Sequence, residues 1–280
     1  MSSDFDNNTL MSAISYFKHV TRLGNDSLEF LEINESLSVF GMRHVNLLKH
    51  SLFQMNRMFN VIEYLASADS SWEEQKIETF DIERLLDEIV NRFYLTVSDY
   101  TEVNIDWQAT LKGSYSIDIN KSKFELAILN LLYCCLKKNP DIKSRPLKIH
   151  ISATENKERI VFHVRDNKKP LSQDIIDSIN DLSVPSLEEI SDQSFKTLVS
   201  LSLRVAYKSV REMGGELTYT PLKSGNRFDI SLPKFVPQAR MSFRSPSHYT
   251  PTYSYYNEVF ADVILEEVIK TINELVKITQ

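Results

Sequence analysis

Apolar residues near the start of the chain recur at alternating steps of four and three. Two series show this spacing, one in residues 10–31 and one in residues 41–66. The spacing predicts two amphipathic helices that pack along a seam, and Asn34 or Ser36 can cap the second helix. Two such helices bury little apolar surface alone, so we expect residues 1–70 to form a homodimeric four-helix bundle. A plain helical spacer is the alternative.

From residue 76 the pattern changes to short alternating runs, which predict strands, between longer runs with helical spacing. Asp81, Pro140 and the pair Gly214-Gly215 supply a helix cap and two helix stops. The expected order is a strand at 76–82, a helix at 82–94, strands at 103–111 and 115–119, a helix at 121–139, a strand hairpin at 146–166, a helix at 196–213, and strands at 216–220 and 227–233. Residues 76–233 therefore predict an α+β domain with helices on one face of a mixed sheet.

The remaining residues, 234–280, differ in composition from the predicted domain. They contain three prolines and four tyrosines, and they end in a segment with helical apolar spacing. One stripe of this segment carries Ile264, Val268, Thr271, Leu275 and Ile278. The spacing predicts a C-terminal amphipathic helix, which packs on its own domain or docks elsewhere, in a partner or over a vacant site.

Composition excludes several classes of function. The 280 residues carry a net charge of −6, whereas a nucleic-acid-binding face must be basic. No apolar run approaches the roughly 20 residues of a membrane span, and the polar, acidic N-terminus is unlike a secretory signal. The only cysteines, Cys134 and Cys135, are adjacent, so no disulfide framework forms and a reducing cytoplasm is expected.

Three stretches between residues 124 and 233 resemble the boxes of bacterial sensor histidine kinases. FELAILNLLYCCLKKNP (124–140) is similar to the asparagine box, NLLxNAxKxxP. VFHVRDNKKPLS (161–172) is similar to the first glycine box, VxDxGxGI. Residues 200–233, SLSLRVAYKSVREMGG and the following strands, are similar to the second box, GLGLxIV, and the domain end. The resemblance implies dimerisation helices followed by the ATPase domain shared with DNA gyrase and the Hsp90 chaperones.

The resemblance also implies positions for a site that binds ATP and Mg²⁺. Asn130 matches the first asparagine of its box, and Asp166 matches the aspartate that accepts the adenine amino hydrogen. Cys134 stands where the family has its Mg²⁺ ligand, and a soft thiol suits Mg²⁺ poorly. Ser200 and Ser202 replace glycines whose amides cradle the triphosphate, although their hydroxyls could still reach a phosphate.

Two further departures fall on the same predicted site. Lys168 and Pro170 replace both glycines of the first glycine box, which adds bulk and removes a backbone donor. The lid that would follow, between Ser172 and Phe195, has six acidic residues and neither lysine nor arginine. That charge is unsuited to closing over a polyanion, unless the segment is a solvated loop directed away from the site. We therefore expect a degraded nucleotide site and no metal site.

The family phosphorylates a histidine on its first dimerisation helix, and His19 lies at about the matching place. Its surroundings lack the acidic residue and the proline of the family segment, so it is either a phosphoacceptor or a surface histidine. The other histidines fit packing or surface positions: His44, His50, His150, His163 and His248. Cys134 and Cys135 are expected to pack as small apolar residues within their helix.

Three hypotheses remain open from the sequence. The first is a cytoplasmic, histidine-kinase-like two-component protein that acts as a pseudokinase, binding a response regulator or another histidine kinase, or passing phosphate through His19. The second is an active ATP-dependent histidine kinase that uses ATP and Mg²⁺. The third is a pure interaction module whose C-terminal tail docks on a partner.

Overall fold

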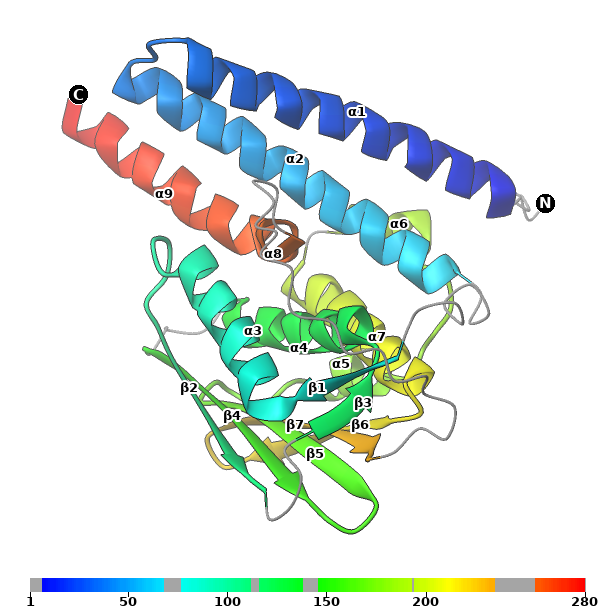
Figure 1. Cartoon of the computed structure of the whole chain (residues 1–280). Helices are drawn as coiled ribbons and strands as arrows, with labels where there is room; N and C mark the ends of the chain where they lie inside the picture. The colour runs from blue at the N-terminus through cyan, green and yellow to red at the C-terminus, as the bar shows by residue number, and fades with distance from the viewer. Residues whose placement is uncertain are drawn as a thin grey trace. The chain divides into compact units, whose positions relative to one another are not determined.

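The structure is a computed structural model in which the chain divides into two compact units (Figure 1). The first unit combines Met1–Ala66 with Tyr253–Gln280, and the second comprises Ser67–Thr252. The residues that the structure describes are 7–67, 77–111, 116–137, 146–192, 194–234 and 255–279. Among the helices of these ranges, none has both the length and the apolar character that crossing a membrane requires.

The first unit begins with a helical hairpin, which confirms the prediction from the apolar spacing. Helix α1 spans Asn7–Asn34 and helix α2 spans Val39–Ala66. Three α1 residues spaced by seven are buried: Ile14, Thr21 and Leu28. The intervening members of the predicted series remain accessible, with Phe17 47% and Leu31 39% exposed. Phe17 nevertheless contacts α2, because its ring stacks on that of Phe59 with the ring centroids 5.6 Å apart.

The cap of the second helix differs from the prediction. Neither Asn34 nor Ser36 caps α2, because α1 continues to Asn34 and the turn follows it. The Asn34 side chain instead donates to the carbonyl of Phe30 at 2.9 Å, within α1. Ser38 performs the capping role, since its hydroxyl oxygen accepts a hydrogen bond from the Gly41 amide at 3.0 Å.

Two C-terminal helices complete the first unit, α8 (Tyr255–Val259) and α9 (Ala261–Thr279). Both pack against α2. Arg57 of α2 and Asp262 of α9 form an ion pair at 3.7 Å, with 4% and 3% of their side chains exposed. Ile264 of the predicted apolar stripe is fully buried, whereas Thr271 is exposed. The C-terminal helix is thus amphipathic as predicted, and it packs on its own chain.

The second unit is built on a five-stranded mixed sheet, which confirms the α+β prediction. The strand order is β2-β4-β5-β7-β6, with β2 parallel to β4 and every other pair antiparallel. A separate two-stranded sheet pairs β1 with β3. The strands are β1 Glu78–Asp81, β2 Val103–Thr110, β3 Ser116–Ile119, β4 Leu147–Glu155, β5 Arg159–Asp166, β6 Glu216–Leu222 and β7 Gly225–Pro233.

Three long helices lie over one face of this sheet (Figure 1): α3 (Ile82–Val97), α4 (Lys121–Leu136) and α7 (Phe195–Glu212). Side chains at their N-termini cap all three, including Asp81, which accepts from the Arg84 amide at 2.9 Å as expected. The short helices α5 (Gln173–Asp177) and α6 (Leu187–Ser191) follow β5. The helix-facing side of the sheet forms the core, whereas the opposite side is polar.

Candidate functional site

Asp166 ends strand β5, and its carboxylate is already engaged by its own chain. One oxygen, Oδ1, accepts from the Lys168 amide at 2.8 Å, the Asn226 amide at 3.2 Å and the Asn226 side-chain amide at 2.8 Å. The residue is only 7% exposed. Burial raises the pKa of the neighbouring Cys135 thiol well above its usual range, and the charge of Asp166 adds to this effect. Asp166, the residue predicted to bind adenine, therefore connects the end of β5 to Lys168 and Asn226.

The start of strand β7 supplies most of these donors. Gly225 has φ 142°, and a Cβ there would lie 2.0 Å from the carbonyl oxygen of Asp166, so only glycine fits. The approach places Asn226, 2% exposed, beside Asp166. Its Oδ1 accepts from the Tyr219 hydroxyl at 2.8 Å and the Leu171 amide at 3.2 Å. The sequence analysis did not identify Asn226, whose only local signal is the Gly-Asn pair.

Lys168, one of the two residues in place of the glycines of the first box, reaches across to helix α4. Its ammonium donates to the carbonyl oxygen of Lys137 at 2.7 Å. Lys137 is the C-cap residue of α4, and a cation there satisfies a terminal carbonyl and complements the helix dipole. The lysine therefore fastens the end of α4 to the end of β5. Helix α4 ends at Leu136, earlier than the sequence predicts from Pro140.

Two further predicted positions, Asn130 and Cys134, lie one turn apart on α4, and both are buried. Asn130 is 3% exposed and donates its side-chain amide to the Leu126 carbonyl at 2.8 Å, within its own helix. Cys134 is 4% exposed, and its thiol donates to the Val199 carbonyl of α7 at 3.8 Å. The described residues contain no cluster of three or more histidine, cysteine, aspartate or glutamate side chains that could hold a metal ion.

Ser200 and Ser202 lie inside helix α7, which begins five residues before Ser200. Ser194 caps the helix by accepting from the Thr197 amide at 3.3 Å. From the second turn onward, the amides of an α-helix donate to carbonyls four residues back, so they cannot cradle a phosphate. Ser202 is fully buried, and the Ser200 hydroxyl lies 2.6 Å from that of Ser178. Whether either hydroxyl reaches a phosphate stays a prediction.

The geometry corresponds to a known ATPase domain. Residues 119–235 match the family described as Histidine kinase-, DNA gyrase B-, and HSP90-like ATPase. This segment is similar to that family over 117 of the 280 residues of the chain. It includes α4, β5 and α7 and hence every predicted nucleotide-site position.

Solved structures share the fold of this segment, and in the three described here the similarity covers 77–85% of the chain. Full-length ShkA in complex with AMPPNP is 18% identical with a TM-score of 0.59, covering 81% of this chain and 45% of that one. Histidine kinase AdeS of Acinetobacter baumannii is 11% identical with a TM-score of 0.50, covering 77% and 96%. Histidine kinase ThkA in complex with response regulator protein TrrA is 14% identical with a TM-score of 0.50, covering 85% and 64%. A search of curated proteins found no match.

The histidines are spread over both units. His19, the predicted phosphoacceptor, is exposed on α1, and His44 is exposed on α2. His50 is buried on α2, where burial lowers its pKa to about 4. On the polar side of the sheet, His150 lies 2.9 Å from Asp106 and His163 lies 2.6 Å from Asp229. His248 lies outside the described residues.

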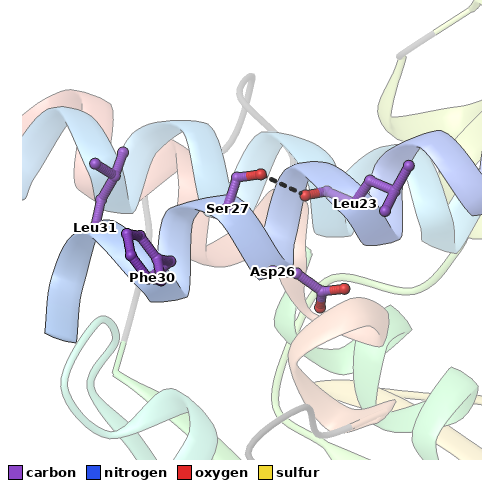
Figure 2. Close-up of a pocket in the computed structure, with 5 residues that line it drawn as sticks. All are labelled: Leu23, Asp26, Ser27, Phe30 and Leu31. Carbon is purple, nitrogen blue, oxygen red and sulfur yellow. Dashed lines mark hydrogen bonds between the residues drawn. The ribbon is translucent and has the colours of Figure 1, made fainter. Parts of the chain in front are cut away.

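Among the surface hollows of the described residues, the two described next do not include Asp166. One, of about 470 Å³, runs along α1 in the first unit (Figure 2) and is lined by Leu23, Asp26, Ser27, Phe30 and Leu31. The Ser27 hydroxyl is turned back to the Leu23 carbonyl at 2.8 Å, so the lining is mainly apolar. The other, of about 380 Å³, lies in the second unit between the end of α3 and the starts of β2 and β4.

Proposed function

We propose that this chain is a histidine-kinase-like two-component signalling protein whose nucleotide site is degraded. It acts as a pseudokinase that binds a partner, or it passes phosphate through His19. The family of residues 119–235 and the fold shared with AdeS and ThkA support the two-component assignment. Of these proposals, the degraded nucleotide site has the most direct support, because Ser200 and Ser202 lie inside helix α7.

Helix α7 carries this argument. A triphosphate carries several negative charges, and a protein without a metal must meet them with backbone amides or cations. Here the amides at Ser200 and Ser202 belong to a helix that is capped at Ser194. The lysine of the first glycine box, Lys168, donates to the carbonyl oxygen at the end of α4. The groups that would bind phosphate are thus used to hold the domain together.

Calorimetry with Mg-ATP tests the degraded site, with Mg-AMPPNP as the non-hydrolysable comparison. We expect no binding heat from the full chain at ligand concentrations up to about 1 mM, which corresponds to a binding free energy weaker than about −4 kcal/mol. Micromolar binding that Asp166→Ala abolishes would instead establish a working site. The active kinase, with Asp166, Asn130, Ser200 and Ser202 around ATP and Mg²⁺, would then be the better assignment.

The exposure of His19 favours the phosphotransfer form of the proposal, since an acceptor must be reached by a donor protein. The complex of ThkA with response regulator TrrA supports a response regulator as the partner. Incubation with a phosphorylated response regulator or a labelled histidine kinase tests this form. Label should appear on the wild type and on His44→Gln, the exposed-histidine control, but not on His19→Ala. Equal labelling of all three proteins would exclude His19, and no labelling would leave partner binding alone.

Homodimerisation is the second part of the proposal, and it rests on the accessible apolar face of the hairpin. On α1, Tyr16, Val20, Leu23 and Phe30 are 45–65% exposed and fall on steps of four, three and seven. On α2, Leu48 and Met55 are 54% and 45% exposed and lie seven apart. An apolar seam with this period is what helices present to other helices in a bundle.

Light scattering after gel filtration tests the dimer. Leu23→Asp introduces a charge into the centre of the apolar face and should convert the protein to a monomer at micromolar concentration. Leu95→Asp is the matched control, because Leu95 is a 75%-exposed leucine on α3 of the other unit. A monomeric wild type, or a Leu23→Asp protein that remains dimeric, would exclude this face as the dimer contact.

A further inference from the structure

Residues 173–189, the place of the expected lid, are bound to one stripe of helix α7. Three α7 side chains spaced by four, namely Lys196, Ser200 and Arg204, each contact this segment. Lys196 donates to Asp174 at 2.8 Å, and the Ser200 hydroxyl lies 2.6 Å from that of Ser178. Residues four apart lie one above another on a helix, so the three contacts form a continuous row.

Arg204 makes the most extensive of these contacts. It is 1% exposed, yet its guanidinium is well supplied with acceptors. Nε donates to the Asp181 carbonyl at 2.7 Å, Nη1 donates to Glu189 Oε1 at 2.6 Å, and Nη2 donates to the Ser183 carbonyl. Two of the three acceptors are backbone carbonyls, so the side chain holds the path of the chain itself.

Glu189 connects this contact to helix α6. Its second oxygen, Oε2, accepts from the Ser186 amide at 3.3 Å, while the Ser186 hydroxyl accepts from the Glu189 amide at 3.1 Å. This is a capping box, so one carboxylate both starts α6 and neutralises Arg204. Below the polar row, Ile175 is 2% exposed and Ile179 is 7% exposed. The segment is therefore packed as well as hydrogen-bonded.

The acidic residues of the segment have local uses that the sequence analysis did not foresee. Hydrogen bonding to Lys196 lowers the pKa of Asp174, and hydrogen bonding to Ser183 lowers that of Asp181. Asp192 accepts from Ser194 and Thr197 beside the start of α7, and the bond from Thr197 is the main cause of its lowered pKa. Two of the carboxylates that argue against a lid over a polyanion, Asp174 and Glu189, thus pair with Lys196 and Arg204 of α7.

We infer that residues 173–189 are a fixed layer of the domain, clamped to α7 by Arg204, and do not open and close around a nucleotide. The inference rests on contacts within the domain. It extends the proposed function, because a fixed segment 173–189 cannot move in response to ATP. A clamped segment presents one shape to a partner whether or not nucleotide is available. A mobile lid, by contrast, needs few buried contacts and exposed backbone hydrogen bonds.

Hydrogen exchange measured by mass spectrometry on the full chain tests the clamp. In the wild type, the amides of 173–189 should be protected without any nucleotide, and 1 mM Mg-AMPPNP should not change them. Arg204→Met should raise their exchange rate by about tenfold or more while the amides of β5 and β7 keep theirs. Lys196→Met is the control on the same stripe, because its ion pair is exposed and its loss should change exchange by about twofold or less.

Glu189→Gln tests the same contact if Arg204→Met fails to fold. It keeps the side-chain shape, but it removes the negative charge beside Arg204 and one of the two acceptor oxygens, so exchange in 173–189 should rise without loss of the β5 protection. Unprotected amides in the wild type that become protected with Mg-AMPPNP would overturn the clamp, as would unchanged exchange in both variants. If calorimetry detects AMPPNP while exchange in 173–189 stays constant, the degraded site fails and the clamp stands.

Discussion

Acidification should weaken the hairpin unit through one buried side chain, His50 of α2. Its imidazole is 7% exposed. Burial is the main cause that lowers its pKa from 6.5 to about 4, the charge of Lys49 adds to the effect, and Glu32 opposes it. Between these two pKa values the unfolded chain binds a proton that the folded unit does not. The stabilisation is therefore complete above pH 6.5 and is lost as the pH falls towards 4.

The size of the effect follows from the two pKa values. A histidine with a pKa of 6.5 in the unfolded chain and about 4 in the folded one lowers the free energy of unfolding by about 2 kcal/mol between pH 7 and pH 5. The full loss, reached below pH 4, is about 3 kcal/mol. Domains are stable by only about 5–15 kcal/mol, so the change is large enough to measure by unfolding.

Denaturant unfolding at pH 7 and pH 5, followed by helical circular dichroism at one protein concentration, measures this loss. His44→Gln is the matched control, because His44 is exposed on the same helix. The wild type and His44→Gln should lose about 2 kcal/mol more than His50→Gln between the two pH values. The reasoning would be refuted by equal losses in all three proteins, or by a nuclear magnetic resonance titration of His50 with its midpoint near 6.5.

Three substitutions test other parts of the structure by thermal or denaturant unfolding. Gly225→Ala should cost about 3 kcal/mol or more, because its Cβ would lie 2.0 Å from the carbonyl oxygen of Asp166; a loss below about 1 kcal/mol would contradict the close approach. Arg57→Met should cost about 3–5 kcal/mol by removing the guanidinium beside Asp262, and replacing Asp262 with leucine as well should recover most of it; additive losses would show that the pair does not interact. Lys168→Met should cost about 1 kcal/mol through the lost contact with the end of α4, and an unchanged stability would show that this cap is unimportant.

The sequence predicted most elements of the fold because their signals are local. Alternation and capping residues set the strands and the helices α3, α4 and α7 to within a few residues. The second buried face of α2 was missed for a physical reason. Phe53, Arg57 and Val61 form this face, and Arg57 looks like a surface residue until Asp262 is brought beside it from the far end of the chain. The sequence alone does not show which neighbour each apolar stripe of a helix packs against, because that depends on the tertiary structure.

The sequence marked the positions of the candidate site but could not supply their new partners. Asp166 was identified by its box, whereas its contacts with Asn226 depend on a turn sixty residues later in the chain. The sequence did not indicate a role for Arg204, because burial of an arginine is expected only when acceptors surround it. Two of those acceptors, at Asp181 and Ser183, come from a loop whose path no periodicity describes, and the third is Glu189 of the short helix α6.

The proposed loss of nucleotide binding has two separable causes, the missing metal ligand and the helical conformation around Ser200, and Cys134→Asn distinguishes them. The substitution restores an oxygen at the family's Mg²⁺ position. That oxygen would still be buried, because Cys134 is 4% exposed beneath the Val199 carbonyl of α7. The amides of Ser200 and Ser202 would also remain in the helix.

We therefore expect Cys134→Asn to show no Mg²⁺-dependent binding of AMPPNP in calorimetry. We also expect it to lose about 1–3 kcal/mol of stability, because an amide replaces a thiol in a packed position. Cys135→Ala, one residue along the same buried helix, controls for the loss of packing. Micromolar, Mg²⁺-dependent binding by Cys134→Asn would show that the ligand alone was limiting. The first turns of α7 would then have to open under the binding energy of the nucleotide, and the helix could no longer be regarded as the barrier.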